Sequence, residues 1–182
     1  MKPYSLQLKY PRLNTTMFAD VLVLGKCKSL LVLGNKCATV FATDFHWSMV
    51  DPIASKSDCH YSLDKLFSDV GIPKYMVPDN AKELTLGDFK KKNQKAQCRL
   101  LPIEPHTPNQ NATEGCIREL LRSYRRRMRE TNTPERLWDV CLSFTSKLRC
   151  HTALNIRGLN GEVPQTVLKG DTADISHLVE FG

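Results

Sequence analysis

The sequence contains no pair of cysteines spaced as CxxC, no apolar run long enough to cross a membrane, and no hydrophobic segment near its N-terminus. The first absence argues against a zinc site with tight ligand spacing, and the other two argue against a membrane partner and a secretion signal. Cys59-His60 and Cys150-His151 are isolated pairs, which are more often a buried thiol beside a surface imidazole than metal ligands. We therefore expect the seven cysteines to be free thiols in an intracellular protein, either nuclear or cytoplasmic.

The positive charge is unevenly distributed along the chain. Lys and Arg number 26 against 19 Asp and Glu, and one arginine-rich segment contributes much of the excess. This segment contains a single acid, Glu119, and six arginines: Arg118, Arg122, Arg125, Arg126, Arg127 and Arg129. Such a run is often only a solvated helix face, but six arginines on one helix favour a polyanion as partner. Contacts from these arginines to phosphates would give affinity for nucleic acid without reading its bases.

The 182 residues suffice for one domain with a core and are too few for two. Pro3 and Pro11 mark residues 1–14 as a tail, which leaves 15–182 as the domain. Strand-forming residues predict five strands: 17–24, 30–33, 37–43, 75–77 and 99–103. Caps and apolar periodicity predict helices that begin near 57, 85, 113 and 133. This order predicts an α/β fold with a five-stranded mixed sheet flanked by helices.

Two acids stand at positions that suit phosphodiester chemistry. Asp79 follows the short apolar segment 75–77, and Glu114 opens the arginine-rich helix with 34 residues between them. Carboxylates presented together by rigid elements hold the divalent ions that activate a nucleophile and stabilise a leaving oxygen in phosphoryl displacement. Mg²⁺ suits such a cluster because it takes one or two carboxylates along with substrate phosphates. Each acid also has a plainer interpretation, since Asp79 suits a turn and Glu114 complements a helix dipole.

A third carboxylate is expected from the first predicted strand. Asp20 is the only acid within 17–24, where a buried side chain of this kind needs a partner. The alternative is an edge-strand carboxylate that faces water, and both interpretations carry similar weight.

Two motifs resemble those of the catalytic core of copia-type retrotransposon integrases, members of the RNase H-like superfamily. The first is VPDNAKEL at 77–84, which resembles the family's second-aspartate motif. The second is HTPNQNATE at 106–114, which resembles its Thr-Pro-x-Gln-Asn-x-x-x-Glu motif. Weaker similarity extends over TDF at 43–45 and the segment 163–182, so that the resemblance covers the chain from about residue 15 to its end.

The resemblance implies an RNase H-like fold and an Asp-Asp-Glu triad of Asp20, Asp79 and Glu114 that binds Mg²⁺ or Mn²⁺. It implies a DNA strand-processing and strand-transfer activity on double-stranded DNA, with a homo-oligomer in an intact element. The expected DNA contacts are Arg118, Arg122, Arg125, Lys90 and Lys91.

The first triad position has two candidates. The branch of the family whose first strand most resembles 16–19 would place the catalytic aspartate at Thr15, whereas the spacing to Asp44 favours Asp20. Side chains five apart on a strand face opposite sides, so only one of the two can join the other acids. With Thr15 in that position, the chain would be a decayed or co-opted copy that binds nucleic acid without chemistry. We also expect a fragment, because the family's zinc domain and C-terminal DNA-binding domain are not recognisable here.

Overall fold

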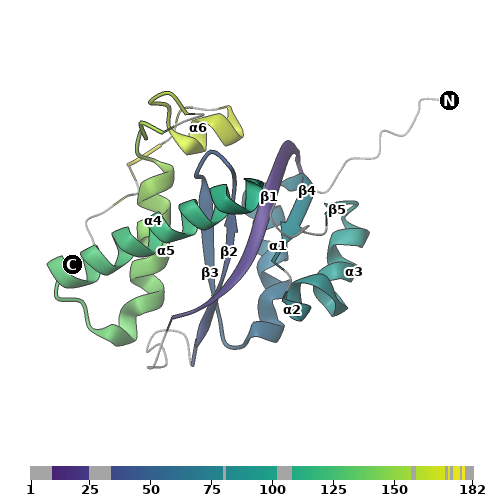
Figure 1. Ribbon diagram of the computed structural model, residues 1–182, viewed down its shortest axis with the longest axis horizontal. Coiled ribbons are helices and arrows are strands. Elements are labelled where there is room, and N and C mark those ends of the chain that lie inside the picture. The colour runs from purple at the N-terminus through teal and green to yellow at the C-terminus, as the bar shows by residue number, and fades with distance from the viewer. Residues whose placement is uncertain are drawn as a thin grey trace.

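Five strands form one mixed sheet in the order β3-β2-β1-β4-β5 (Figure 1). Their bounds are β1 Arg12–Val23, β2 Cys37–Ala42, β3 Ser48–Ile53, β4 Ile72–Pro78 and β5 Arg99–Leu100. β1, β2 and β3 pair antiparallel, and β4 and β5 continue the sheet parallel to β1. The computed structural model describes these residues: 10–24, 34–79, 81–101, 108–156 (backbone alone for 108–113), 159–170, 172, 174–176 and 178.

Helices cover both faces of this sheet. They are η1 Lys56–Asp58, α1 Cys59–Asp69, α2 Lys82–Thr85, α3 Gly87–Lys95, α4 Pro108–Glu130, η2 Glu135–Leu137, α5 Trp138–Cys150 and α6 Pro164–Lys169. One core lies under α1, α2 and α3, where Leu63, Leu84 and Phe89 pack against Met17 of the sheet. A second core lies under α4 and α5, where their apolar side chains pack on Val40 of β2. The predicted five-stranded mixed sheet with flanking helices is thus confirmed.

β1 begins earlier than the sequence suggested. Residues 12–14, which we assigned to a tail, belong to β1, and Arg12 and Leu13 pair with the start of β4. The N–H of Ile72 donates to the Pro11 carbonyl at 2.8 Å. The close approach requires Gly71, whose φ of +126° suits glycine and whose Cβ, if present, would lie 2.8 Å from that carbonyl oxygen. The strand is interrupted by a bulge between Leu13 and Thr16.

The antiparallel part of the sheet differs from the prediction. The predicted strand at 30–33 lies outside the described residues, and the third strand is β3, which we did not predict. β3 contains Asp51 and Pro52, which obscure its strand pattern. Both are tolerated because β3 is the edge strand of the sheet, where charge and a missing N–H cost little.

Helix boundaries follow local chemistry more closely. The predicted start near 57 is found as η1 leading into α1, with a capping box between Ser55 and Asp58. The helix expected from 133 is found as η2 and α5. In contrast, α4 starts at Pro108 rather than Thr113, as a proline in the first turn permits.

Candidate metal and nucleic-acid site

The pairing of β1 with β4 determines where the first two acids lie. Ala19 pairs with Pro78 in parallel register, and the N–H of Asp79 donates to the Ala19 carbonyl at 2.9 Å. The next residue of each chain segment is therefore an aspartate, Asp20 on β1 and Asp79 directly after β4. Because neighbouring strands lie about 4.8 Å apart, the register places these two aspartates side by side at the carboxyl edge of β4.

The side chain of Asp20 points to the sheet face covered by α4. It shares this face with Leu22, and its cross-strand neighbour Val40 packs in the core with Leu120 of α4. Asp20 is half-buried, and its Oδ1 accepts the N–H of Val21 at 2.7 Å.

The electrostatic environment of Asp20 suits a cation. Burial raises its pKa, and the nearby charge of Asp79 raises it further, whereas the N–H of Val21 and the charge of Lys56 act to lower the pKa. A half-buried carboxylate and an exposed one that repel each other gain from a positive ion placed between them. Lys56, in η1, was not among the candidate residues, because no spacing in the sequence connects it to Asp20.

Thr15 lies well away from this pair. It sits at the bulge of β1, five residues before Asp20, which corresponds to about 15 Å along a strand. Its hydroxyl lies 3.4 Å from the carbonyl of its neighbour Thr16. The structure therefore places Asp20, and not Thr15, beside Asp79.

Glu114, the third expected acid, comes from α4 rather than from the sheet. It is the seventh residue of α4, so it lies on the second turn rather than the first turn that we expected, and its side chain is exposed. Within the described part of the chain, no group of three or more His, Cys, Asp or Glu side chains is arranged to hold a metal ion. α4 does pack on the sheet face to which Asp20 points, so Glu114 belongs to the same side of the molecule.

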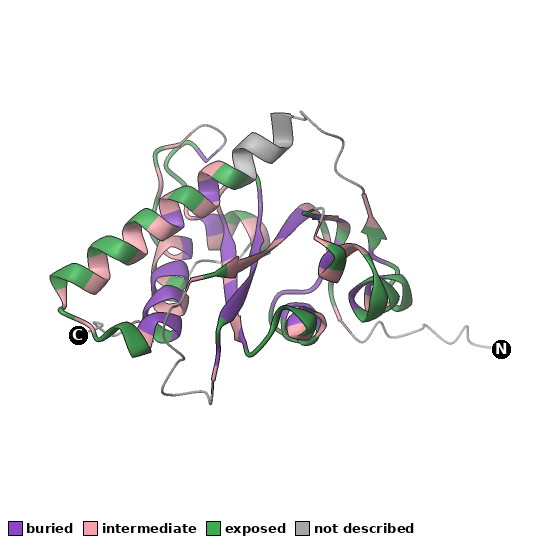
Figure 2. Ribbon diagram, turned by 60° about the horizontal axis from the view of Figure 1, so that its bottom comes forward, coloured by how far each residue is buried: buried purple, intermediate pink, exposed green. Residues whose placement is uncertain are grey.

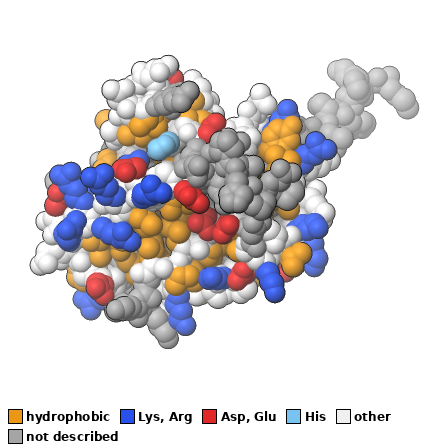
Figure 3. All heavy atoms as spheres, viewed as in Figure 1, with side chains coloured by type: hydrophobic (Ala, Val, Ile, Leu, Met, Phe, Trp, Pro, Cys, Tyr) orange, Lys and Arg blue, Asp and Glu red, His pale blue; other side chains and the backbone are white. Residues whose placement is uncertain are grey.

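The exposed side of α4 carries a continuous line of positive charge, which we call the arginine stripe: Arg118, Arg122, Arg125, Arg126 and Arg129. With 3.6 residues per turn, Glu114 and the stripe fall within about 120° of the helix circumference. Figure 2 shows that this side of α4 is exposed, and Figure 3 shows Lys and Arg side chains gathered over it. The sixth arginine, Arg127, turns away and lies over the ring of Phe144 at 5.3 Å.

The far half of the stripe surrounds a surface hollow of about 400 Å³, lined by Glu119, Arg122, Ser123, Arg126 and Arg129. Arg126 pairs with Glu130 at 2.7 Å, and Arg122 lies 3.8 Å from Glu119. Exposed pairs of this kind contribute little free energy, so these arginines remain available to an anion. Arg118 and Arg125 make no ion pair with any described residue. With three arginines and one glutamate in its lining, the hollow is cationic.

Lys90 and Lys91, which we also expected to contact DNA, lie elsewhere. Both are on α3, which covers the opposite face of the sheet from α4. Lys91 pairs with Asp88 at 3.1 Å. The structure therefore does not bring these lysines together with the arginine stripe.

Six cysteines lie within the described part of the chain. They are free, buried thiols: Cys37, Cys59, Cys98, Cys116, Cys141 and Cys150. Burial raises the pKa of Cys59 to about 11 and that of Cys98 to about 12. His60, next to Cys59, lies with its Nδ1 2.8 Å from the carbonyl of Ser57, as expected for a surface imidazole beside a buried thiol. Among the described helices, none is long and apolar enough to cross a membrane.

Comparison with known proteins adds the fold family. No family model and no curated protein matches the sequence. Among solved structures, the chain is similar to the catalytic core domain of BIV integrase, with a TM-score of 0.64 and 12% identity over 85% of this chain and 93% of that one. It is similar to the HTLV-2 integrase catalytic core in complex with magnesium in a trimeric form, with a TM-score of 0.64 and 12% identity over 86% and 97%.

A third match is the simian T-cell lymphotropic virus intasome in complex with a PP2A regulatory subunit. Its TM-score is 0.67 with 16% identity, over 98% of this chain and 64% of that one. At these identities the comparisons establish the fold, which is the RNase H-like fold of retroviral integrase catalytic cores.

Proposed function

We propose that this protein is the catalytic core of a copia-type retrotransposon integrase, a metal-dependent enzyme that processes DNA ends and transfers DNA strands. The observation that carries the proposal is the register of β1 with β4, which brings Asp20 beside Asp79 on the sheet face under α4. The fold shared with retroviral integrase cores supports it, as do the two sequence motifs that end at Leu84 and Glu114.

Asp20 and Asp79 fit one divalent ion. Their carboxylates are hard oxygen donors, and Mg²⁺ takes one or two such groups together with waters and substrate phosphates. When bound, Mg²⁺ or Mn²⁺ supplies charge that activates the attacking oxygen and stabilises the leaving oxygen. Glu114 lies on α4, on the same side of the molecule, and would complete the ligand set when substrate is bound. The core of HTLV-2 integrase contains magnesium, which supports the choice of ion.

The arginine stripe positions the nucleic acid in this proposal. From Glu114 to Arg129 the helix rises about 22 Å, so the stripe follows a DNA backbone over several phosphates leading to the two aspartates. Arginine suits this role because its planar group donates two parallel hydrogen bonds to one phosphate. In an intact element we expect a homo-oligomer, as supported by the trimeric form of the HTLV-2 core.

A strand-reversal assay tests the proposal. With Mn²⁺ and a DNA substrate that carries a pre-joined strand, the protein should show weak activity. Activity should be lost in Asp20→Asn, Asp79→Asn and Glu114→Gln, while DNA affinity stays unchanged because none of these acids holds phosphate directly. The matched control is Asp69→Asn, at the exposed end of α1. Activity that persists in Asp20→Asn would rule out the assignment of the pair.

A second candidate function is a DNA-binding remnant without chemistry. It is favoured by one observation, that Glu114 does not join the aspartates in a three-residue metal cluster within the described residues. The same assay separates the two functions. Salt-dependent DNA binding without strand reversal in Mg²⁺ or Mn²⁺ would establish the remnant.

A further inference from the structure

Lys56 lies at the same end of the sheet as the aspartate pair. β3 runs parallel to β1, because both strands pair antiparallel with β2. In this ladder Val40 of β2 is paired with Asp20 on one side and with Val50 on the other, and β3 ends soon afterwards at Ile53. η1 follows within the next few residues, so Lys56 lies beyond the carboxyl end of β3, at the edge of the sheet that carries the two aspartates.

The turn that carries Lys56 is fixed by hydrogen bonds. The N–H and the hydroxyl of Ser55 both donate to Oδ2 of Asp58, at 3.0 Å and 2.9 Å, and close a capping box around η1. The end of β3 is attached to the start of β2, because the N–H of Lys36 donates to the carbonyl of Ile53 at 3.2 Å. The side chain of Lys56 therefore projects from a defined backbone position.

The ammonium of Lys56 acts on Asp20 without being paired with it. Lys56 is exposed, and its ammonium makes no hydrogen bond or ion pair with a described residue. Its charge nevertheless lowers the pKa of Asp20 through space. The charges that act on Asp20 are thus one acid, Asp79, and one lysine from a different strand connection.

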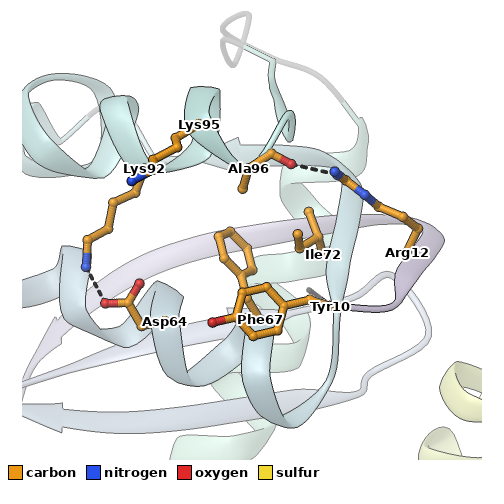
Figure 4. A pocket seen from close by; sticks show the side chains of 8 residues that line it. All are labelled: Tyr10, Arg12, Asp64, Phe67, Ile72, Lys92, Lys95 and Ala96. Atoms are coloured by element: carbon orange, nitrogen blue, oxygen red, sulfur yellow. Dashed lines mark hydrogen bonds and ion pairs between the residues drawn. The ribbon is translucent and has the colours of Figure 1, made fainter. Parts of the chain in front are cut away.

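Two cations on the opposite face of the sheet are placed differently. Figure 4 shows Arg12 donating to the carbonyl of Ala96, at 2.6 Å, and Lys92 paired with Asp64. These contacts connect α3 to β1 and to α1, so both cations serve the packing of the fold. Lys56 has no such contact within the described part of the chain, and its charge remains available to a substrate.

A lysine beside a pair of metal-binding carboxylates suits a substrate phosphate. Lys56 would repel a divalent ion held by Asp20 and Asp79, because both carry positive charge. A phosphate removes this conflict, since one of its oxygens faces the ion while another accepts from the ammonium. Negative charge on these oxygens is stabilised by a cation that is already in place when the phosphate reacts.

We propose that Lys56 contacts the reacting phosphate of the DNA substrate and joins Asp20, Asp79 and Glu114 as a residue of the site. The inference rests on the proposed function and adds to it a substrate contact. The arginine stripe binds phosphates farther along the backbone, whereas Lys56 binds the phosphate at the aspartate pair.

The test combines Lys56→Gln with a DNA substrate in which the reacting phosphate is replaced by an uncharged methylphosphonate. Binding of the duplex with a pre-joined strand is measured by fluorescence anisotropy in MgCl₂. With the natural phosphate, Lys56→Gln should weaken binding by about three- to tenfold, as expected for one contact to a charged group. With the methylphosphonate it should have no further effect, because both changes remove the same contact. Lys56→Arg should bind both substrates as the wild type does.

The matched control is Lys36→Gln. Lys36 is also exposed and lies at the same end of the sheet, but the charges that act on the pKa of Asp20 are those of Asp79 and Lys56. The ratio of its affinities for the two substrates should equal that of the wild type.

A second measurement needs no DNA. Because Lys56→Gln removes a positive charge that repels a divalent ion, it should tighten Mn²⁺ binding by about two- to fivefold, measured from the electron paramagnetic resonance signal of free Mn²⁺. Lys36→Gln should leave this affinity unchanged. Weaker Mn²⁺ binding in Lys56→Gln would overturn the proposal, because the lysine would then only support the fold of the site.

Equal weakening of both substrates by Lys56→Gln, or no weakening of either, would also overturn the proposal. This failure is distinct from failure of the proposed function. Strand reversal that persists in Asp20→Asn would refute the function, whereas the contact of Lys56 is refuted by the ratio of the two binding constants alone.

Discussion

Replacing Asp20 by Asn should stabilise the protein in the absence of divalent metal. The substitution keeps an oxygen to accept the N–H of Val21, and it removes a half-buried charge that faces Asp79. For unit charges on neighbouring strands about 5–6 Å apart, an effective dielectric of about 20 and partial exposure give a repulsion on the order of 1–2 kcal/mol. In a chain of this length, that corresponds to a rise in Tm of about 2–8 °C.

The effect of Asp20→Asn should depend on pH in a defined direction. Because the pKa of Asp20 in the folded state is raised above its ordinary value of 3.8, the folded state holds the proton more tightly than the unfolded chain does. The free energy of unfolding of the wild type therefore falls as the pH rises from 3.8 through the folded pKa. The advantage of the variant should be absent below that window and fully developed above it.

Divalent metal should reverse the order of stability. An ion held by Asp20 and Asp79 stabilises the wild type and not the variant, by about 2.7 kcal/mol when its concentration is a hundredfold above Kd, which exceeds the advantage of the variant. The assay is thermal unfolding followed by circular dichroism from pH 3 to pH 8, with and without MgCl₂, and Asp69→Asn is the control. A variant that is less stable than the wild type at neutral pH without metal, or that gains equally from Mg²⁺, would refute the reasoning.

Three further predictions follow from the site and the fold. Replacing Arg118, Arg122 and Arg125 by alanine should make the slope of log binding constant against log salt concentration shallower by about 2–3 units, at about 0.9 per phosphate contact. Lys90→Ala/Lys91→Ala should leave this slope unchanged. Gly71→Ala should lower the free energy of unfolding in urea by about 1–3 kcal/mol, because alanine disfavours the positive φ of this position and its Cβ would meet Pro11. Gly115→Ala is the control and should not destabilise the protein, because a Cβ there meets open space. The described cysteines should react slowly with an alkylating agent at pH 8 in the folded protein, because they are buried and burial raises the pKa of Cys150 to about 12. Rapid labelling of these cysteines before unfolding would contradict their burial.

Features encoded by a few adjacent residues could be predicted from the sequence. The start of α1 depends on Ser55 and Asp58, and its end depends on Gly71, all within reach of local rules. Asp79 was located because it follows the short apolar segment 75–77, which the sequence predicts to be a strand.

Features that depend on tertiary placement could not be predicted in the same way. β3 escaped detection because its Asp51 and Pro52 are acceptable only at a sheet edge, and no local pattern states which strand is at the edge. The charge of Lys56 lowers the pKa of Asp20 through space, although the two residues are 36 positions apart in the sequence. The choice between Thr15 and Asp20 required the register of β1 with β4, which pairs residues about 60 positions apart.

The bulge in β1 divides that strand into two parts that tolerate length changes differently. After the bulge, from Thr16 to Asp20, inserting or deleting one residue would turn Asp20 to the wrong face, because side chains alternate along a strand. Before the bulge, the extra residue already present between Leu13 and Thr16 shows that the ladder absorbs a change in length there. Related sequences should therefore vary in length upstream of Thr16 and keep a constant number of residues from that point to the aspartate.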